Sequence, residues 1–415
     1  MRNLYSFLTS LSSVGLHAAA LFSPKMKQFV QGRKGVLKRL QEAVKPGDQI
    51  VWFHCASLGE YEQGVPIMQA VKARYPSYRL LVTFFSPSGY EVKKDSSLGD
   101  ITLYLPLDTK ANAKEFVRLA NPKLALFVKY EFWPNYLFEL QNAKIPTLLV
   151  SGLFRKDQVF FKRDGLMRKA LRSIDHFFVQ NVESESLLND IGIKKVTNSG
   201  DTRFDRVSHQ IEQDNSLDFM DQFVNGSPCL VCGSTWPEDD TVLLDFINGK
   251  EGIKTVIAPH NMDEGKIQRL QQNLKRPSLR FSAYKDQDLS KYDVLIMDAI
   301  GYLTRLYSYA DVAYVGGAMG STGLHNILEA ATFGVPIVIG QHYSNFPEAI
   351  RLRSLAGLFS IASAQELNEV MNALFDDKTH REHTGMICGH FVNSNTGATN
   401  TIMAYMEKLN GDGLV

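Results

Sequence analysis

The chain has little cysteine and almost no net charge. Four cysteines among 415 residues suit a reducing compartment, because structural disulfides belong to oxidising ones. The 45 lysines and arginines are balanced by 44 aspartates and glutamates, which leaves a formal net charge of +1. A protein that binds nucleic acid through its phosphates needs a clear basic excess. We therefore expect no nucleic-acid partner.

Metal-binding patterns are also scarce. Cys229 and Cys232 form the one CxxC spacing, but they lie in an apolar run that predicts a strand. Residues three apart on a strand point to opposite faces, so these two thiols could not bind one ion. We expect neither zinc nor redox chemistry here.

No apolar run is long enough for a confident membrane span. The most apolar segment, residues 4–22, is interrupted by polar side chains, whereas a spanning helix needs about 20 mainly apolar residues. Lysines and arginines follow at residues 25–39, and no acidic residue occurs before Glu42. This pattern is typical of a segment lying on an anionic cytoplasmic leaflet, which we favour over a first helix packed only on its own domain.

From residue 48 onward, short apolar runs alternate with helical patterns. This alternation predicts parallel strands with helices on both faces. The expected strands form two groups, at residues 50–54, 79–84, 101–105, 124–128, 146–150, 176–180 and 195–199, and at residues 229–232, 254–258, 279–282, 293–298, 312–315, 335–339 and 358–361.

The polar stretch 206–228 separates the two groups and predicts a linker with one helix. The sequence thus predicts an α/β fold of two doubly wound, Rossmann-like domains facing a central cleft. We place a membrane-associating segment at 1–40, the amino-terminal domain at 41–205, the carboxyl-terminal domain at 229–390 and a closing helix at 391–415. Such a cleft could hold one substrate on each wall.

Glu60 is the first catalytic candidate. It follows the strand 50–54 through Cys55-Ala56-Ser57-Leu58-Gly59, and ligands of open α/β sheets bind beyond the carboxyl ends of strands. A carboxylate there is a candidate general base. Ser57 and Glu60 also have the spacing of a capping box, in which both side chains bind backbone amides. Pro66 disfavours that alternative, because it would lie inside the capped helix, and the helical pattern itself spans 66–75.

Glu131 is the second carboxylate at a strand end. It follows the strand 124–128 in Glu131-Phe132-Trp133-Pro134-Asn135, where the early proline marks a helix start. It could face the same cleft as Glu60. The alternative is an incidental loop charge.

In the second domain, two loops rich in small residues follow strands. Ser234 and Thr235 come after the strand 229–232, and a Gly-rich loop runs from Gly316 to Gly323, after which we expect a helix from His325. Loops of this kind expose backbone amides and suit a phosphate. Asn326 would lie in the first turn of that helix and Glu329 beside it, where it could accept from ribose hydroxyls. The spacing is not that of a P-loop, because no Gly-Lys-Ser/Thr is present.

Five segments occur together in the order of one family. They are His54–Glu60, Glu131–Asn135, Gly200–Asp205, Gly233–Thr235 and His325–Glu329. With these segments, the chain resembles the 3-deoxy-D-manno-octulosonic acid (Kdo) transferases of lipopolysaccharide synthesis from about residue 2 to 410.

The resemblance implies a GT-B fold and an inverting transfer of Kdo from CMP-Kdo to the lipid A precursor lipid IVA. The reaction would take place at the cytoplasmic face of the bacterial inner membrane, with no cofactor or metal. Glu60 would be the base that deprotonates the acceptor hydroxyl, and Glu131 the second acidic residue on the acceptor side. Ser57, Gly59 and Arg203 would contribute to substrate binding.

On the donor side, the resemblance implies that Asn326 and Glu329 hold the CMP phosphate and ribose. Further substrate-binding residues would be Ser234, Thr235, His260, Gly323 and His325. His260 stands where the family usually has an arginine, and Leu324 replaces the second glycine of a Gly-Gly-His-Asn pattern. The alternatives are another GT-B enzyme, such as a UDP-sugar transferase or an epimerase, and a non-catalytic membrane protein that binds nucleotide sugars.

Overall fold

The computed structural model describes residues 2–411. Within them, nothing is described for the side chains of Ser13, Val14, His17, Lys25, Asn410 and Gly411. Val14, His17 and Lys25, which the sequence analysis counts in the apolar–basic segment, therefore lie outside the described side chains. So do Met1 and residues 412–415, the outermost parts of the first and last predicted segments.

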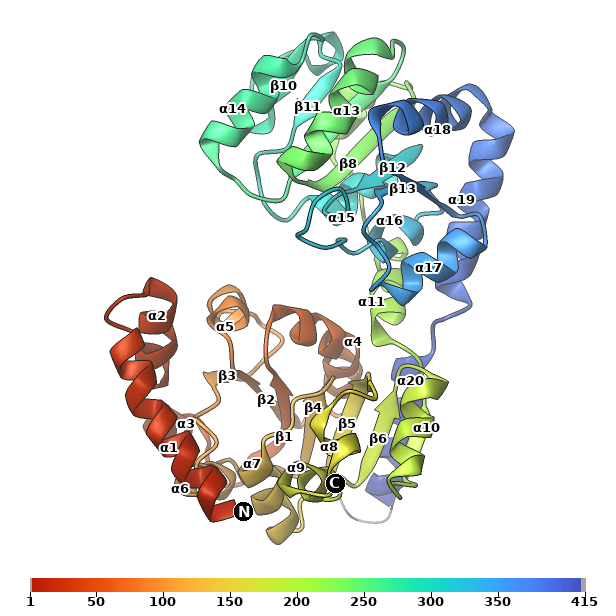
Figure 1. Cartoon of the computed structure of the whole chain (residues 1–415). Coiled ribbons are helices and arrows are strands. Elements are labelled where there is room, and N and C mark those ends of the chain that lie inside the picture. The colour runs from red at the N-terminus through yellow and green to blue at the C-terminus, as the bar shows by residue number, and fades with distance from the viewer. Residues whose placement is uncertain (1, 412–415) are drawn as a thin grey trace. The chain divides into compact units, whose positions relative to one another are not determined.

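The chain divides into two compact units, which are described separately (Figure 1). Unit 1 comprises Met1–Arg206 and Thr396–Val415, and unit 2 comprises Val207–Asn395. The last helix, α20 (Ala398–Gly411), thus belongs to unit 1, where it packs on α4 (Leu58–Arg74). Asp205 fixes its start, because the carboxylate accepts bonds from the backbone amides of Gly397 (2.6 Å) and Thr399 (2.7 Å).

Unit 1 contains a seven-stranded parallel sheet of order β3-β2-β1-β4-β5-β6-β7. Its strands are β1 (Gln49–Cys55), β2 (Tyr78–Phe84), β3 (Ile101–Tyr104), β4 (Leu124–Val128), β5 (Thr147–Gly152), β6 (His176–Val179) and β7 (Val196–Asn198). Each predicted strand of this group is present, with ends shifted by at most a few residues. The apolar runs of the central strands β1, β4 and β5 are buried on both faces, as a sheet covered by helices on each side requires.

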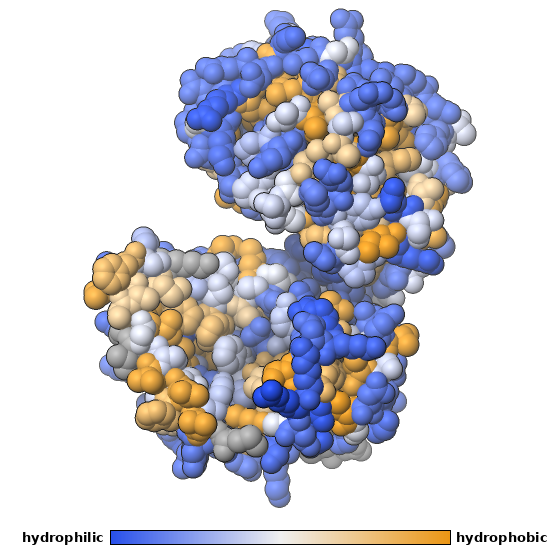
Figure 2. Space-filling view, viewed as in Figure 1, coloured by the Kyte–Doolittle hydropathy of each residue, from blue (hydrophilic) through white to orange (hydrophobic). Residues whose placement is uncertain are grey.

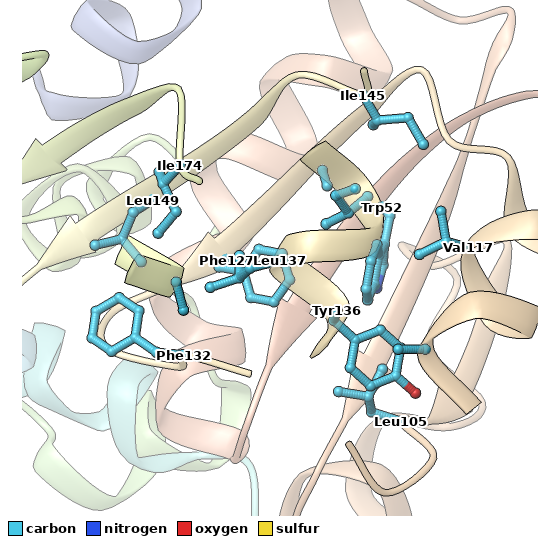
Figure 3. Packing of buried hydrophobic residues seen from close by; sticks show 14 of the residues in the cluster. Trp52, Leu105, Val117, Phe127, Phe132, Tyr136, Leu137, Ile145, Leu149 and Ile174 are labelled. Carbon is cyan, nitrogen blue, oxygen red and sulfur yellow. The ribbon is translucent and has the colours of Figure 1, made fainter. Parts of the chain in front are cut away.

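Successive side chains of β1 pack into two different hydrophobic clusters, one on each face of the sheet. Trp52 packs on one face with Phe127 of β4 and with Tyr136 of α7 (Pro134–Asn142), as Figure 3 shows. Phe53 packs on the other face, where Ile402 of α20 joins the core. The period of two along a strand places neighbours on opposite faces. Two layers of helices therefore cover the sheet.

Unit 2 repeats this architecture with the order β10-β11-β9-β8-β12-β13-β14. Its strands are β8 (Cys229–Thr235), β9 (Lys254–Pro259), β10 (Ser278–Arg280), β11 (Val294–Ile296), β12 (Val312–Val315), β13 (Ile337–Gly340) and β14 (Leu358–Ile361). All of their pairings are parallel. The second group of predicted strands is confirmed as well. Cys229 and Cys232 lie on β8, as expected, and both are buried.

The remaining helices connect or flank the strands. They are α1 (Arg2–Ala19), α2 (Pro24–Arg33), α3 (Val36–Ala43), α5 (Pro87–Lys93), α6 (Lys110–Ala120), α8 (Val159–Lys162), α9 (Leu166–Leu171), α10 (Val182–Asp190), α11 (Thr202–Ile211), α12 (Asp218–Val224), α13 (Pro237–Gly249), α14 (Glu264–Asn273), α15 (Leu303–Leu306), α16 (Leu328–Ala331), α17 (Pro347–Ser354), α18 (Ala364–Asp376) and α19 (Lys378–Asn393), with 3-10 turns at Phe281–Ala283, Leu289–Lys291 and Tyr307–Tyr309. The polar stretch 206–228 contains the end of α11 and all of α12.

Two helix starts differ from the sequence-based expectation. The helix expected at 66–75 begins at Leu58, and Pro66 lies inside it. The helix expected from His325 begins only at Leu328. In the second case the side chain of Asn326 accepts a bond from the amide of Leu328 (3.1 Å), so it caps the helix from outside.

The amino-terminal helix α1 is amphipathic. Arg2, Tyr5 and Ser6 on one side bond to unit 1, whereas Leu4, Phe7, Leu8 and Leu11 on the other side are between 53% and 64% exposed. Figure 2 shows apolar side chains gathered over this region, and Leu21 and Phe22, between α1 and α2, are also exposed. Within residues 2–411, no helix combines the length and apolarity needed to cross a membrane.

Gly340 supports a test of how tightly unit 2 holds its Gly-rich loop. A Cβ at this position would lie 2.3 Å from the backbone carbonyl carbon of Ala318 and 2.3 Å from the nitrogen of Met319. Gly340→Ala should therefore shift the loop and destabilise the protein by about 1–3 kcal/mol. The measurement is the urea midpoint of the full chain by circular dichroism.

Gly249→Ala is the matched control. Gly249 ends α13, and a Cβ there would meet nothing within 4 Å, so its midpoint should stay at or slightly above that of the unmodified protein. Equal midpoints for both variants would contradict the close packing at Gly340.

Candidate functional site

Two carboxylates of unit 1 lie where the strand order reverses. β1 pairs with β2 on one side and with β4 on the other, and ligands of doubly wound sheets bind at this switch point. Glu60 is in the first turn of α4, directly after β1, and Glu131 is in the loop directly after β4. The structure therefore brings the two predicted acidic residues to the carboxyl ends of adjacent strands.

Glu60 is 8% exposed and is bound by Ser57. Ser57 is the N-cap of α4, with extended backbone (φ −139°), but its side chain makes no capping bond to the backbone. The hydroxyl instead donates to Oε2 of Glu60. The capping-box interpretation is therefore wrong for Ser57, because its hydroxyl orients the carboxylate and not the amides. Gly59 lies between the two, and a Cβ there would meet only Ser57 Oγ, at 3.7 Å.

Glu131 titrates close to neutral pH. Burial and, to a smaller extent, the negative charge of Glu60 raise the pKa of its carboxyl to about 7, while Trp133 and Lys129 oppose the shift. At neutral pH the Glu131 carboxyl is therefore close to half protonated.

Sequence reasoning missed the two rings beside Glu131. His54 Nε2 accepts a bond from the indole nitrogen of Trp133 (2.8 Å) and lies 4.0 Å from Glu131 Oε2. His54 Nδ1 bonds to Thr83 Oγ1 (2.9 Å). Complete burial lowers the pKa of His54 to about 3, so the ring is neutral and no ion pair with Glu131 forms. Both rings lie in segments that carry the family resemblance, His54–Glu60 and Glu131–Asn135. Those segments were singled out for Glu60 and Glu131.

Arg203 lies farther along unit 1, at the start of α11. Its guanidinium pairs with Asp201 (2.7 Å), and the neighbouring Thr202 donates to the backbone carbonyl of Gln63 on α4 (2.7 Å). These contacts attach the segment 200–205 to the rest of unit 1. Substrate binding by Arg203 stays a prediction.

Unit 2 has its own switch point, where β8 pairs with both β9 and β12. Ser234 has a left-handed backbone (φ +55°) at an irregularity near the end of β8, and Thr235 beside it is 3% exposed. A Cβ on Gly316, after β12, would lie 2.4 Å from the carbonyl oxygen of Ser234. Glycine at this position therefore lets the two predicted loops pack directly on each other.

Asp239 fixes the Gly-rich loop. This carboxylate is fully buried on α13 and accepts bonds from the amide of Gly317 (2.9 Å), the amide of Trp236 (2.9 Å) and the hydroxyl of Tyr314 (2.8 Å). The Asp239 carboxylate thereby connects β12 and the loop after it to the start of α13. Gly323 has φ +93° near the loop's end, a conformation that favours glycine.

Asn326 and Glu329 lie side by side, as predicted. Asn326 Nδ2 donates to Glu329 Oε1 (3.2 Å), and Thr304 donates to Glu329 Oε2 (3.2 Å). Asn326 also caps α16 through Oδ1. Because α16 starts only at Leu328, the expected placement of Asn326 inside a first helical turn is wrong.

Three rings form a stack beside these loops. His260 lies between Trp236 (4.7 Å between centroids) and His325 (4.4 Å), and the indole nitrogen of Trp236 donates to His325 Nε2 (3.0 Å). Burial lowers the pKa of His260, and that of His325 falls to about 4, because of burial and then of His260. Both rings are thus neutral at pH 7 and add no fixed positive charge. Lys266, over the Trp236 ring at 5.9 Å, is a nearby cation that the sequence did not single out.

Comparison with known proteins shows which family this part of the chain resembles. Residues 29–206 match the family model described as 3-deoxy-D-manno-octulosonic-acid transferase (kdotransferase), and this range includes both acidic residues and their ring neighbours. This part of the chain is similar to the Kdo transferases. The predicted resemblance is confirmed, and with it the assignment to the glycosyltransferases.

Relatives extend the match beyond unit 1. The 3-deoxy-D-manno-octulosonic acid transferase of Chlamydophila psittaci is 28% identical over 334 residues, 76% of this chain and 76% of that protein. The enzyme of the same name from Haemophilus influenzae is 25% identical over 401 residues, 93% of this chain and 92% of that protein.

The fold is also that of known GT-B-type structures. A UDP-GlcNAc 2-epimerase from Neisseria meningitidis has a TM-score of 0.63 at 15% identity and covers 87% of this chain and 100% of its own. The predicted GT-B class of two doubly wound domains is confirmed by this likeness and by the two parallel sheets.

The coupling of the two carboxyls can be measured directly. Glu60→Gln should lower the pKa of Glu131, because a neighbouring negative charge that opposes ionisation is removed. The pKa is read from the carbon-13 carboxyl shift of labelled glutamate during a pH titration, with Glu131→Gln used to assign the signal.

Glu62→Gln is the control on the same helix. Glu62 pairs with Lys93 (3.0 Å) and with Arg206 (3.0 Å), and it does not contribute to the shift of Glu131. The Glu131 titration should therefore stay unchanged in Glu62→Gln. An unchanged titration in Glu60→Gln as well would show that the two carboxyls are uncoupled.

Proposed function

We propose that the chain transfers Kdo from CMP-Kdo to the lipid A precursor lipid IVA in lipopolysaccharide synthesis, with inversion at the anomeric carbon. One observation carries the proposal: Glu60 and Glu131 follow the two adjacent strands at the switch point of unit 1, inside the range that matches the Kdo transferase family model. Relatives named for this transferase match most of the chain and support it further.

In the proposed reaction, Glu60 is the general base. An acceptor hydroxyl attacks the anomeric carbon of Kdo and loses its proton to Glu60, while the bond from that carbon to the CMP phosphate oxygen breaks. Inversion requires one direct displacement, so the base and the leaving group lie on opposite faces of the sugar. Ser57, whose hydroxyl binds Glu60 Oε2, keeps that carboxylate in one orientation.

Glu131 assists on the acceptor side. With a pKa of about 7, its ionised form accepts a hydrogen bond from a sugar hydroxyl and its protonated form donates one. Its partial protonation also limits the negative charge next to Glu60 at neutral pH. Arg203 and Gly59 are proposed to complete the acceptor side.

Unit 2 is proposed to bind CMP-Kdo at its own switch point. The groups offered there are the loops at Ser234–Thr235 and Gly316–Gly323 and the Asn326–Glu329 pair. Because His260 and His325 are neutral at pH 7, stacking by these rings and hydrogen bonding replace the charge of an arginine. Leaving as CMP, with one phosphate, requires less neutralisation than a diphosphate, so we propose no cofactor and no metal.

The acceptor is a lipid, and α1 supplies a surface that fits a membrane. Its exposed face carries Leu4, Phe7, Leu8 and Leu11, while the opposite face is bonded to unit 1. A helix of this kind lies in the interface plane with its apolar face among the lipids. We propose peripheral binding to the cytoplasmic leaflet of the inner membrane.

The decisive assay is product formation by the purified chain from CMP-Kdo and lipid IVA. We expect the acceptor mass to increase by the Kdo unit, and no product from UDP-sugars. Transfer or epimerisation of a UDP-sugar would favour the alternative GT-B enzymes. Binding of CMP-Kdo without product would favour a non-catalytic nucleotide-sugar-binding protein.

Glu60→Gln should reduce transfer by at least about a hundredfold, within the range that general-base catalysis contributes, while leaving CMP-Kdo binding nearly unchanged. Initial rates and calorimetric binding are compared with those of Glu62→Gln, which should retain most activity. Near-normal turnover in Glu60→Gln would remove it from the role of base.

Replacing Leu4, Phe7, Leu8 and Leu11 together by serine should abolish cosedimentation with vesicles that contain anionic phospholipid. The control replaces Val159 and Val182, which are 53% and 64% exposed on other helices of unit 1, by serine. It should bind vesicles like the unmodified chain. Undiminished binding of the α1 variant would show that another surface contacts the membrane.

A further inference from the structure

We propose that Asp108 is a positioning residue that holds the Glu131 loop in place and ties it to the seating of α1. This inference rests on the proposed function, because it concerns the acceptor-side residue Glu131.

The loop that carries Glu131 is short and is fixed at both ends. It connects Val128, the last residue of β4, to Pro134, the first residue of α7. At the first end, Lys129 has a left-handed backbone (φ +73°), and its amide donates to the carbonyl of Val150 on β5 (2.8 Å). At the second end, the indole of Trp133 donates to His54 (2.8 Å). Glu131 lies midway between these anchors.

Asp108 holds the start of the helix that follows. Its Oδ2 accepts from the amide of Asn135 (3.2 Å) and its Oδ1 from the amide of Tyr136 (3.1 Å). The amides of a first helical turn lack partners within the helix, so a carboxylate from elsewhere is a strong substitute. Asp108 is 1% exposed. Trp133, the N-cap residue of α7, makes no capping bond with its side chain. The position of the second anchor therefore depends on Asp108.

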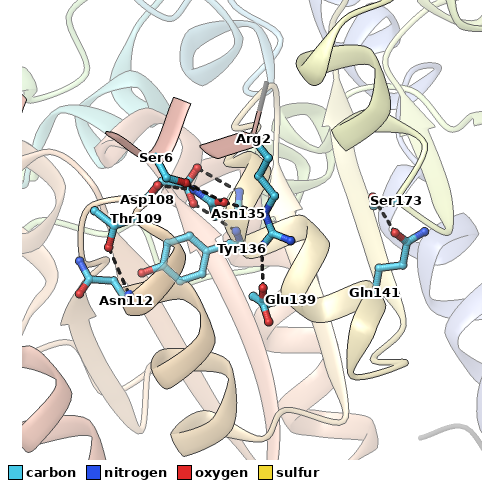
Figure 4. Close-up of polar contacts among 10 residues, drawn as sticks. All are labelled: Arg2, Ser6, Asp108, Thr109, Asn112, Asn135, Tyr136, Glu139, Gln141 and Ser173. Carbon is cyan, nitrogen blue, oxygen red and sulfur yellow. Dashed lines mark hydrogen bonds and ion pairs between the residues drawn. The ribbon is translucent and has the colours of Figure 1, made fainter. Parts of the chain in front are cut away.

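The same carboxylate binds α1. Oδ2 of Asp108 accepts a bond from the hydroxyl of Tyr5 (2.9 Å). Asn135, which is completely buried, donates to the backbone carbonyl of Asp108 (2.7 Å) and to Ser6 Oγ (3.0 Å), and it accepts from Nε of Arg2 (2.9 Å). Figure 4 shows Ser6, Asp108 and Asn135 meeting between α1, the segment after β3, and α7. The helix with the exposed apolar face thus shares its anchors with the catalytic loop.

The shared anchors have a functional meaning. The Asp108 carboxylate accepts bonds from two backbone amides and from the Tyr5 hydroxyl. When α1 moves away, it loses the bond from Tyr5. The Trp133–Pro134 turn then loses its fixed position, and Glu131 moves with it. An arrangement of this kind couples the seating of α1, and thereby its contact with lipid, to the geometry of the acceptor site.

Asp108→Asn and Tyr5→Phe test the proposal. Asparagine keeps the size of the side chain but places an amide hydrogen against a backbone donor, and phenylalanine removes only the hydroxyl. For Kdo transfer we expect kcat to fall at least about tenfold in Asp108→Asn and a few-fold in Tyr5→Phe, with the KM for CMP-Kdo unchanged. The double variant should be no worse than Asp108→Asn, because both changes act through one carboxylate.

A second readout separates positioning from folding. The carbon-13 titration of Glu131 should shift in both variants, and it does so whether or not the chain transfers Kdo, so failure of the proposed function leaves this test intact. Asp100→Asn is the control, since Asp100 accepts from the amide of Leu80 (2.7 Å) and pairs with Lys72 (3.1 Å) away from the loop. It should alter stability alone.

The proposal is overturned if both variants, corrected for their folded fraction, keep the kcat and the Glu131 titration of the unmodified chain. It is also overturned if Asp100→Asn shifts the titration as much as Asp108→Asn, because the effect would then reflect general loss of stability. If Asp108→Asn does not fold, Tyr5→Phe alone decides, since removing one hydroxyl leaves the capping carboxylate in place.

Discussion

The reversal of strand order in each parallel sheet is the constraint on which the site depends. The order reverses at β1 and β4, and again at β8 and β12, and doubly wound sheets bind ligands beyond the carboxyl ends of such strands. Glu60 and Glu131 follow the first pair, and Ser234 and the Gly-rich loop follow the second. Each set is built from segments far apart in the chain, and the pairing of the strands alone brings its members together.

Much of this could be predicted from the sequence because parallel strands are signalled locally. Runs such as Leu124–Val128 are buried on both faces and therefore read as continuous apolar segments. The residues after them were found by their position alone. Strand order could not be read in this way, since it is decided by which faces pack, and so neither switch point was placed.

The errors arise where a side chain bonds to a partner that its spacing in the sequence does not predict. Ser57 has the spacing of a cap, yet its hydroxyl binds a carboxylate, and Asn326 caps a helix that starts three residues later than the pattern suggests. His54 and Trp133 are missed because their bond joins residues 79 positions apart. Burial also sets the protonation of His54 and Glu131. It keeps His54 neutral and is the main cause of the pKa of about 7 at Glu131, and neither effect is visible in the sequence.

The return of α20 to unit 1 has a consequence for how the chain is made. Ile402, Met403 and Met406 belong to the core on one face of the sheet, α20 packs on α4, and Asp205 holds the start of α20. Unit 2 is continuous in the chain, whereas unit 1 is interrupted by it. During synthesis the sheet of unit 1 therefore emerges before unit 2 but lacks one helix of its core until α20 leaves the ribosome. Unit 2 can complete its fold earlier, and in the meantime the uncovered face of unit 1 is an apolar surface for chaperones to protect.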